Sequence, residues 1–277
     1  MDERLLTIQD ISCVGQCSLT VALPVISSCG IETAVLPSSV LSNHTAFSSW
    51  TFCDLTAQMP VILEEWKKQG IDFSAFYTGY VSAEQIPLIK QIIAQTARAG
   101  SCVFVDPVMA DNGKMYTGFA PDFPDRMKEL CRISDYVLPN ITEACFLLGE
   151  DYPGETCDEA FVERTCKGLL ELGSKCAVLT GVSFKEQELG VAVLSKGSPR
   201  VDYYFAPRLP VQMHGTGDVF ASVFAGSVLR GKSALEAASL AADVVVQAIK
   251  ATLDDKADHW YGVKFEKAIP YLVSRLS

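Results

Sequence analysis

Short apolar runs alternate along the chain with longer segments whose apolar residues recur every three or four positions. The short runs are bounded by glycine, proline or polar residues and are typical of buried strands, whereas the longer segments are typical of helices that pack on one face. The strands predicted in this way are residues 5–9, 33–36, 75–78, 102–105, 136–138, 176–179, 189–194 and 203–205, the last two forming a β pair.

Glycines mark the expected ends of the helices, and capping boxes mark several of their beginnings. A capping box places Ser or Thr three positions before Glu or Gln, so that each side chain serves the backbone of the other. Such boxes occur at residues 82–85, 156–159 and 233–236. The helices expected to stop at glycine are residues 18–29 before Gly30, 61–69 before Gly70, one from 82 to near Gly100 and one from 156 to Gly173.

The alternation of strands and helices predicts an α/β fold. Strands linked by helices of this length form right-handed βαβ units, which assemble into a mostly parallel central sheet with helices on both faces. No long linker, repeat or low-complexity segment interrupts the pattern, so a single domain over residues 1–277 is expected.

Polar or turn-forming residues follow five of the predicted strands. Ligands of open parallel sheets bind beyond the carboxyl ends of the strands, so these residues predict a ligand crevice along one sheet edge. They are Gln9 with Asp10, Thr78 to Tyr80, Asp106 with Pro107, Asn140 with Glu143, and Thr180 with Gly181.

Composition narrows the classes of partner. The chain has 23 basic and 33 acidic residues, a net charge of −10, which argues against non-specific binding of nucleic acid or of an anionic membrane. No apolar run is long enough for a membrane span, and charges occupy the N-terminus where a secretory signal would be apolar. The ten cysteines show no CxxC pair and fall mostly in apolar periodic segments. We therefore expect a cytoplasmic protein with reduced, buried cysteines and no structural zinc.

The stretch HGTGDVF at residues 214–220 is the first candidate for chemistry. A helix N-terminus attracts anions, and glycines at Gly215 and Gly217 let the backbone approach a phosphate closely. Asp218, in the first turn, could accept a proton from an attacking hydroxyl group. The alternative is that Thr216 or Asp218 simply caps the helix. Neither a P-loop motif nor a complete GxGxxG motif is present, so any phosphate site must use this later helix N-terminus.

Two further segments carry carboxylates at strand ends. Asn140 and Glu143 are three residues apart at a helix start and could hold a hydrated Mg²⁺, or they could belong to a capping arrangement with Thr142 as the N-cap. Asp106 could add charge near the metal. The loop from Asp111 to Tyr116 could form a mobile flap, although its Asp-Asn-Gly segment is also an ordinary turn sequence.

Histidine is rare in the chain, with three in total. His44 lies among small polar residues after a strand, so contact with a ligand and a structural role are both open. His214 directly precedes the proposed anion site and could line it, whereas His259 is expected at the surface.

Taken together and in this order, these segments resemble the ribokinase-like superfamily and, within it, the pyridoxal (vitamin B6) kinases. The resemblance covers essentially the whole chain. Its motifs are LSNHT at 41–45, YTGY at 77–80, DPVMADNGKMY at 106–116, PNITE at 139–143, VLTG at 178–181 and HGTGD at 214–218. It implies an ATP-dependent kinase that phosphorylates the 5′-hydroxymethyl group of pyridoxal, pyridoxine or pyridoxamine, without a large separate lid domain.

The resemblance also implies roles for particular residues. Asp218 would be the catalytic base, and the N–H groups of residues 215–217 would stabilise charge on the transferred phosphoryl group. Asp106 and Glu143 would position Mg²⁺. The nucleotide-binding set would be Asp106, Asp111, Tyr116, Asn140, Thr180 and Gly181, and the substrate-binding set Asp10, Ser12, His44, Thr45, Tyr80 and His214. Members of the family commonly form homodimers and are often helped by a monovalent cation such as K⁺.

Two positions depart from the family pattern. Pyridoxal kinases often have a serine where this chain has Asp10, with Ser12 close by as a substitute, and an acid there favours a ring nitrogen or an amine as its partner. His214 replaces a cysteine found in some dual-substrate bacterial relatives, so a thiol adduct with the pyridoxal aldehyde is not expected here.

Four alternatives to pyridoxal kinase stay open. The nearest is a kinase of hydroxymethylpyrimidine, a thiamin precursor that is also an aromatic heterocycle with a hydroxymethyl group. A sugar kinase is disfavoured because no inserted β lid is evident. A non-catalytic sensor of nucleotide or vitamin, or a generic Rossmann-like binding protein, would not need Asp218, Glu143 and the glycines together.

Overall fold

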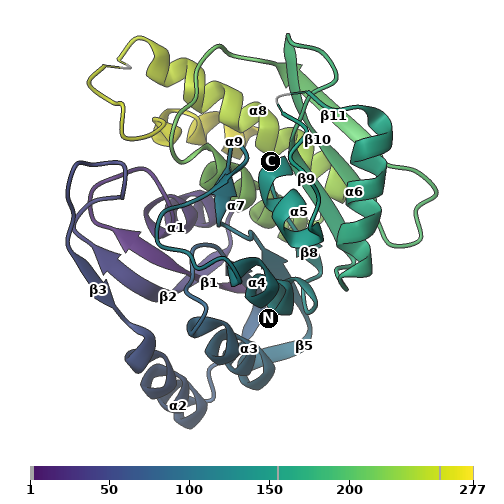
Figure 1. Ribbon diagram of the computed structural model, residues 1–277. Helices are drawn as coiled ribbons and strands as arrows, with labels where there is room; N and C mark the ends of the chain where they lie inside the picture. Colours follow the sequence, from purple (N-terminus) through teal and green to yellow (C-terminus); the bar gives the residue numbers. More distant parts are fainter. Residues whose placement is uncertain (1–2, 155, 256, 277) are drawn as a thin grey trace.

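A nine-stranded sheet crosses the molecule in this computed structural model, which describes residues 3–154, 156–255 and 257–276 (Figure 1). The strand order is β11-β10-β9-β8-β5-β4-β1-β2-β3, so segments from both halves of the chain meet in one sheet. The strands are β1 (Arg4–Ser12), β2 (Glu32–Leu41), β3 (Phe52–Asp54), β4 (Phe73–Thr78), β5 (Ala97–Val105), β8 (Tyr136–Val137), β9 (Cys176–Val182), β10 (Glu188–Ser195) and β11 (Asp202–Pro207).

The inner strands are parallel, and both edges of the sheet are antiparallel. Every neighbouring pair from β2 through β9 is parallel, whereas β3 pairs antiparallel with β2 at one edge. At the other edge, β10 pairs antiparallel with both β9 and β11. The predicted mostly parallel sheet is confirmed, including the pairing of its last two strands.

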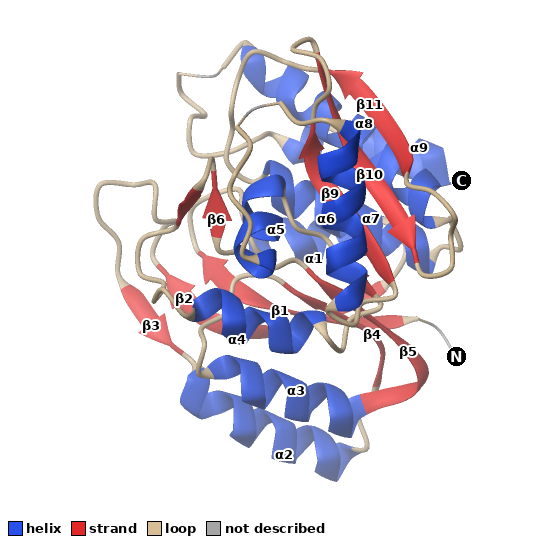
Figure 2. Cartoon of the chain, turned by 45° about the vertical axis from the view of Figure 1, so that its right-hand side comes forward, coloured by secondary structure: helices blue, strands red, loops and turns tan. Residues whose placement is uncertain are grey.

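Helices cover both faces of the sheet (Figure 2). Successive strand residues point to opposite faces, so Leu6 and Ile8 join the core under α2 to α6 while Leu5 joins the core under α1 and α7 to α9. The helices are α1 (Leu19–Ser28), α2 (Met59–Gln69), α3 (Gln85–Thr96), α4 (Phe123–Cys131), α5 (Ile141–Leu148), α6 (Glu159–Glu171), α7 (Thr216–Leu229), α8 (Ala234–Leu253) and α9 (Ile269–Leu276).

Two helix boundaries differ from the predictions. The helix expected to run to Gly100 ends at Thr96, because the following residues pair with β4 and lengthen β5. The box predicted at residues 156–159 is wrong. Asp158 is the N-cap of α6, and its carboxylate accepts a hydrogen bond of 2.7 Å from the backbone N–H of Phe161.

Of the other two predicted capping boxes, one is confirmed and one forms only in part, and several short elements were not predicted. The box at residues 233–236 is confirmed, with Ser233 and Glu236 each bonded to the backbone of the other. At residues 82–85 half of the pattern forms: the Gln85 side chain accepts from the Ser82 backbone N–H, but Glu84 is the N-cap. The chain pattern missed α4, α9, β3 and the hairpin of β6 (Ala110–Asp111) and β7 (Lys114–Met115), which are short or lack strong periodicity.

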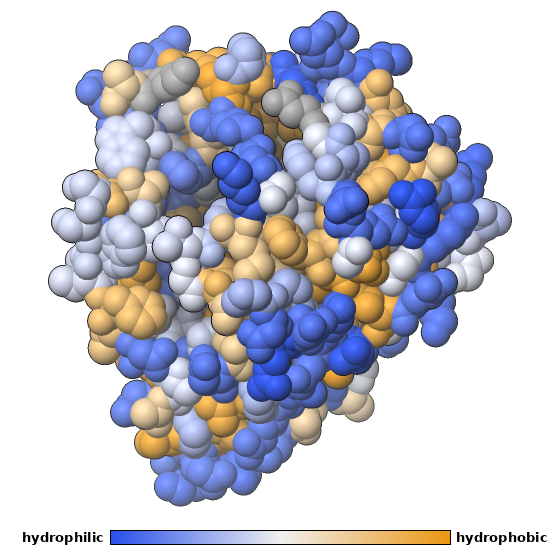
Figure 3. Space-filling view, viewed as in Figure 1, coloured by the Kyte–Doolittle hydropathy of each residue, from blue (hydrophilic) through white to orange (hydrophobic). Residues whose placement is uncertain are grey.

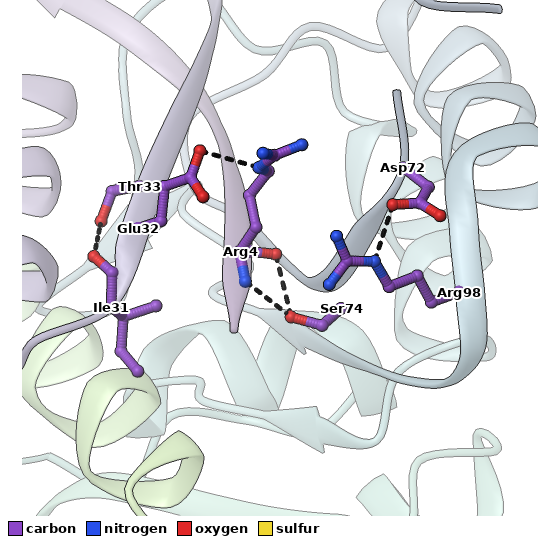
Figure 4. A network of polar contacts seen from close by, with 7 residues as sticks. All are labelled: Arg4, Ile31, Glu32, Thr33, Asp72, Ser74 and Arg98. Carbon is purple, nitrogen blue, oxygen red and sulfur yellow. Dashed lines mark hydrogen bonds and ion pairs between the residues drawn. The ribbon is translucent and has the colours of Figure 1, made fainter. Parts of the chain in front are cut away.

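Structural contacts occupy the amino ends of the strands (Figure 4). The backbone N–H of Arg4 donates to the Ser74 hydroxyl over 2.9 Å, and its guanidinium pairs with Glu32. Arg98 pairs with Asp72 nearby. Partly exposed ion pairs of this kind typically contribute about 0–1 kcal/mol each to the free energy of unfolding. They link the amino ends of neighbouring strands.

The expectation that the cysteines are buried is met only in part, because Cys13 and Cys53 are exposed. Hydrophilic residues cover most of the face seen in Figure 3, and apolar residues are exposed there in separate groups. Within the described residues no helix has the length and apolar character to cross a membrane. The cysteines on the apolar periodic segments are buried, among them Cys131, Cys145, Cys166 and Cys176.

Helices α1 and α7 pack closely because α7 presents small residues to α1. A β-carbon at Gly226 would lie 2.5 Å from the Cys29 sulfur. We expect Gly226→Ala to lower the free energy of unfolding by about 1–3 kcal/mol, as overpacking does, despite the better helix propensity of alanine. Urea unfolding measures this loss. Combining it with Cys29→Ala should recover part of the stability, and a single variant as stable as the wild type would contradict this packing.

Candidate active site

The HGTGD segment forms a tight turn into α7. Gly215 is the N-cap with a left-handed φ of 80°, and a β-carbon there would lie 1.8 Å from the carbonyl oxygen of Gln16. No side chain caps the helix, and the Thr216 hydroxyl donates instead to the Met213 carbonyl. The capping alternative is therefore wrong, and the N–H groups of the first turn keep their capacity to bind an anion.

A cavity of about 670 Å³ opens over this turn, at the carboxyl ends of β5, β8 and β9. It is bounded by the N-terminal ends of α5 and α7, by the β6–β7 hairpin and by the segment after β11. Many of the predicted residues line it together: Asp106, Asp111, Tyr116, Asn140, Glu143, Thr180, Gly181, His214, Gly215, Thr216, Gly217 and Asp218.

Asn140 and Glu143 form a capping box that also holds the loop after β5. The Glu143 carboxylate accepts from the backbone N–H of Asn140 over 2.9 Å and from that of Met109 over 3.1 Å. The Asn140 amide donates to the carbonyl of Ala110 over 2.9 Å. Asn140, and not Thr142, is thus the N-cap, and the box fixes the loop that carries Asp106.

Asp106 and Glu143 are buried carboxyl groups close to one another. Burial is the main cause that raises both pKa values, that of Glu143 to about 8, and the charge of Glu143 further raises the pKa of Asp106. Within the described residues no group of three His, Cys, Asp or Glu side chains is arranged to hold a metal. Two crowded carboxylates nevertheless suit Mg²⁺, which keeps several waters and takes few protein ligands.

The segment predicted as a flap is the β6–β7 hairpin. Asp111 and Tyr116 are exposed and line the cavity, and the Tyr116 backbone N–H donates to the Met109 carbonyl over 2.8 Å. The Thr142 hydroxyl anchors the hairpin by accepting from the Gly113 backbone N–H over 3.0 Å. The hairpin is therefore tied to the start of α5, next to the capping box.

Asp218 lies between the cavity and a second group of polar residues at the end of β1. Burial raises its pKa to about 7, and the negative charge of Asp10 contributes to the rise. A hydrogen bond from the Ser18 backbone opposes it. Ser18 has a φ of 51°, which is unusual for a residue other than glycine, so a strained backbone presents its N–H to Asp218.

The residues predicted to bind the substrate lie in two places, one at the end of β1 and one around His44 and His214. Asp10 and Ser12 are buried side by side at the end of β1. Burial raises the pKa of the phenol of half-buried Tyr80, and the charge of Asp10 adds to the rise. Thr45 is exposed, and His214 lines the cavity with its ring 5.2 Å from that of His44.

His44 has both ring nitrogens engaged within the protein. Its Nε2 lies 2.8 Å from the Tyr261 carbonyl oxygen, and its Nδ1 accepts from the Ala46 backbone N–H over 3.1 Å. A neutral ring protonated on Nε2 satisfies both contacts, and burial lowers the pKa of the imidazole. This geometry favours the structural role of His44 over a direct contact with a ligand. His259 is half-buried and hydrogen-bonded to Gly262, not an ordinary surface residue.

The apolar wall of the cavity was not predicted. It comes from β10, from α8 and from the segment after β11, and it includes Leu189, Val191, Pro207, Leu209, Ala242, Val245, Val246 and Ile249. The four residues on α8 follow helical spacing and were visible as an apolar stripe. Such a stripe does not distinguish a cavity wall from ordinary core.

The fold and the site together are those of a ribokinase-like small-molecule kinase. The chain belongs to the phosphomethylpyrimidine kinase family, whose model matches residues 54–261. A Bacteroides thetaiotaomicron protein assigned to the phosphomethylpyrimidine kinases, crystallised with pyridoxal, is 33% identical with a TM-score of 0.93, covering 98% of this chain and 96% of its own.

Pyridoxal kinases are also among the similar proteins. The Lactobacillus plantarum pyridoxal kinase structure is 31% identical with a TM-score of 0.89, covering 98% of this chain and 97% of that one. The pyridoxal kinase PdxY of Rubrobacter xylanophilus is 27% identical over 261 residues, 90% of this chain and 88% of that protein. The predicted resemblance to ribokinase-like pyridoxal kinases is confirmed.

The tight turn before α7 leads to a first test. Gly215→Ala should lower the free energy of unfolding by more than about 1 kcal/mol and abolish phosphoryl transfer, because its β-carbon would collide with Gln16 and its φ is left-handed. Gly217→Ala is the matched control for folding, since the added carbon would meet no atom within 4 Å apart from its chain neighbours and the backbone of its own helix. Thermal unfolding compares the two, and equal melting temperatures would contradict the expected collision.

The raised carboxyl pKa values lead to a second test. Glu143 and Asp218 bind protons more tightly in the folded than in the unfolded protein, with folded pKa values of about 8 and about 7. Their contribution to stability is therefore full below about pH 4 and is lost as the pH rises through 7 to 8. Urea unfolding at about pH 5.5, 7 and 8.5 should show a shallower loss in Glu143→Gln, and equal slopes would refute the assignment. Added MgCl₂ should also reduce the loss.

Proposed function

We propose that the protein transfers the γ-phosphoryl group of ATP to the 5′-hydroxymethyl group of pyridoxal, pyridoxine or pyridoxamine. The observation that carries the proposal is the position of Asp218. Asp218 is half-buried in the first turn of α7, between a cavity of nucleotide size and the polar group around Asp10, and desolvation raises the pKa of its carboxyl group to about 7. Similarity to pyridoxal kinases over most of the chain supports the choice of substrate.

Asp218 acts as the general base for the substrate hydroxyl. A base works best when its pKa lies near the working pH, because it is then both available and able to take the proton. The N–H groups of the turn at residues 215–217 face the same space and stabilise negative charge on the phosphoryl group during transfer. Positioning and electrostatics thus account for the reaction, without covalent chemistry by the protein.

Asp106 and Glu143 would hold Mg²⁺, which supplies positive charge against the nucleotide phosphates. Because Glu143 already accepts two backbone N–H groups, Asp106 is the more accessible of the two carboxylates. Asn140 and Thr180 contact the phosphates from the ends of β8 and β9. The apolar wall formed by β10 and α8 suits the adenine ring, and the β6–β7 hairpin covers the nucleotide.

Three expectations stay predictions, the first two from the family resemblance and the third from the sequence composition. They are a homodimer, assistance by a monovalent cation such as K⁺, and a location in the cytoplasm. Size-exclusion chromatography with light scattering tests the first, and comparison of KCl with tetramethylammonium chloride in the kinase assay tests the second.

Hydroxymethylpyrimidine is retained as a second candidate substrate because the matching family model is that of phosphomethylpyrimidine kinase. Its hydroxymethyl group could be presented to Asp218 in the same way. Assays of ATP consumption with each of the three B6 vitamers and with hydroxymethylpyrimidine, supplied separately, rank the substrates. Turnover of the pyrimidine alone would overturn the B6 proposal while keeping the mechanism.

Asp218→Asn should lower kcat by roughly 10²–10⁴-fold, because it removes one positioned acid–base group. KM for ATP should change much less, since the helix N-terminus and the carboxylates around Asp106 still bind the nucleotide. Steady-state kinetics with the preferred vitamer measures both constants. The same change at Asp254, an exposed residue at the end of α8, is the control. A rise in KM with an unchanged kcat would show that Asp218 is not the base.

A further inference from the structure

A small polar cluster lies inside the apolar layer between the sheet and α7. It consists of Gln9 on β1, Tyr77 on β4 and Ser222 on α7, and all three residues are fully buried. The core on this side of the sheet is built from apolar residues such as Leu5 and Val223. Polar atoms in such surroundings need hydrogen-bond partners, because burial without a partner costs free energy.

The strand register brings the first two of these side chains to one face of the sheet. In the parallel pairing of β1 with β4, Thr7 lies opposite Tyr77, and Gln9 shares the face of Thr7 because it is two residues further along the strand. The Gln9 amide donates to the Thr7 hydroxyl over 2.8 Å. Gly79 makes room for the other end of this amide, since a β-carbon there would lie 2.5 Å from Gln9 Oε1. The carbonyl oxygen of Gln9 is thus held against β4, on the face that carries Tyr77.

Three oxygen atoms of the cluster have no hydrogen-bond partner among the described residues. They are Gln9 Oε1 and the hydroxyl oxygens of Tyr77 and Ser222. Burial raises the pKa of the Tyr77 phenol well above its ordinary value, and the charges of Asp106 and Asp218 add to the rise, so the hydroxyl keeps its proton. The side chains of Ser222 and Gln9 oppose the rise, which places both of them near the same hydroxyl. Two hydroxyl groups and one acceptor oxygen therefore converge in a buried place.

Ser222 connects this cluster with the start of α7. It follows Asp218 by four residues, so the two side chains lie on neighbouring turns along one side of the helix. The charge of Asp218 also reaches the Tyr77 hydroxyl, which lies on the sheet beneath this part of the helix. A shift of Ser222 relative to β4 would therefore move the turn that carries Asp218.

We propose that Gln9, Tyr77 and Ser222 bind one internal water molecule on the sheet side of Asp218, and that this water makes Tyr77 a positioning residue for the base. The water donates to Gln9 Oε1 and accepts from the two hydroxyl groups, which matches the roughly three hydrogen bonds of a typical buried water. It links β1, β4 and α7, and so it holds the first turns of α7 on the sheet. The water site stands apart from the proposed function, whereas the positioning role rests on it, because that role takes Asp218 as the base.

Thermal unfolding of Tyr77→Phe tests the water site through the sign of its effect. Loss of a hydroxyl group that is bonded to water should lower the melting temperature by about 2–4 °C, the equivalent of one hydrogen bond in a protein of this size. Loss of a hydroxyl group without a partner would instead remove a buried unsatisfied group and raise the melting temperature. Ser222→Ala should lower the melting temperature more in the wild type than in Tyr77→Phe, because the water is already lost in that variant.

Steady-state kinetics tests the positioning role. Tyr77→Phe should lower kcat by roughly 2–10-fold, the equivalent of one hydrogen bond, and leave both KM values unchanged. KM is spared because the described residues that line the cavity do not include Tyr77. Tyr203→Phe is the matched control and should leave kcat unchanged. It removes another buried hydroxyl that has no partner among the described residues, on β11 and in the core on the opposite face of the sheet.

A crystal structure of the wild-type protein shows directly what the cluster binds. One ordered water within about 2.7–3.2 Å of Gln9 Oε1 and of both hydroxyl oxygens is expected. A direct hydrogen bond between Tyr77 and Ser222 without a water, or a higher melting temperature in Tyr77→Phe, would overturn the site and leave the proposed function intact. An ordered water with an unchanged kcat in Tyr77→Phe would overturn the positioning role alone. Absence of turnover by the wild type would refute the proposed function, while the crystal structure and the melting temperatures still decide the water site.

Discussion

The carboxylate of Glu143 joins two sides of the cavity. It accepts backbone N–H groups from the start of α5 and from the loop after β5, and so it fixes where Asp106 stands relative to Asn140. The hairpin that covers the cavity is anchored to the same helix turn through Thr142. A buried carboxyl group that accepts several backbone hydrogen bonds is held rigidly. The positions of Asp106 and Asn140, which would meet a nucleotide, therefore depend on Glu143.

A second constraint is the crowding of four carboxyl groups, none of which forms an ion pair with another described residue. Asp10, Asp106, Glu143 and Asp218 are drawn together at the carboxyl edge of the sheet, and each has a pKa raised mainly by burial. Such an arrangement lowers the stability of the ligand-free protein. A Mg²⁺ ion held by Asp106 and Glu143 would supply positive charge that the protein itself does not place there, and its binding would then stabilise the folded protein.

The strand ends and the helix start that carry the site residues could be predicted from the sequence, because several local signals agree at those positions. The strand ends before Asp106 and Asn140 carry both apolar periodicity and polar punctuation, and Gly215 with Asp218 is a strong local pattern. The strand end predicted before Thr180 is wrong, because β9 continues through Thr180 to Val182. The role of His44 could not be predicted, since it depends on the carbonyl of Tyr261, more than two hundred residues away. The N-cap of α6 is Asp158 and not Thr156. Both residue types are good N-caps, so the sequence alone does not choose between them, and the tertiary position of α6 decides. The apolar stripe on α8 has the same periodicity whether it faces a cavity or a core.

The loop at Gln16 has a consequence for the order in which the protein becomes functional. Its backbone lies against Gly215, and its side chain lies against Gly262, where a β-carbon would come within 2.4 Å. The backbone N–H of Val263 also bonds to the carbonyl of His214. The turn before α7 is therefore shaped by one segment near the start of the chain and one near its end. During synthesis, the turn cannot take its final shape until residues beyond 260 have left the ribosome, so a shortened translation product would hold most of the sheet and yet lack the support of this turn.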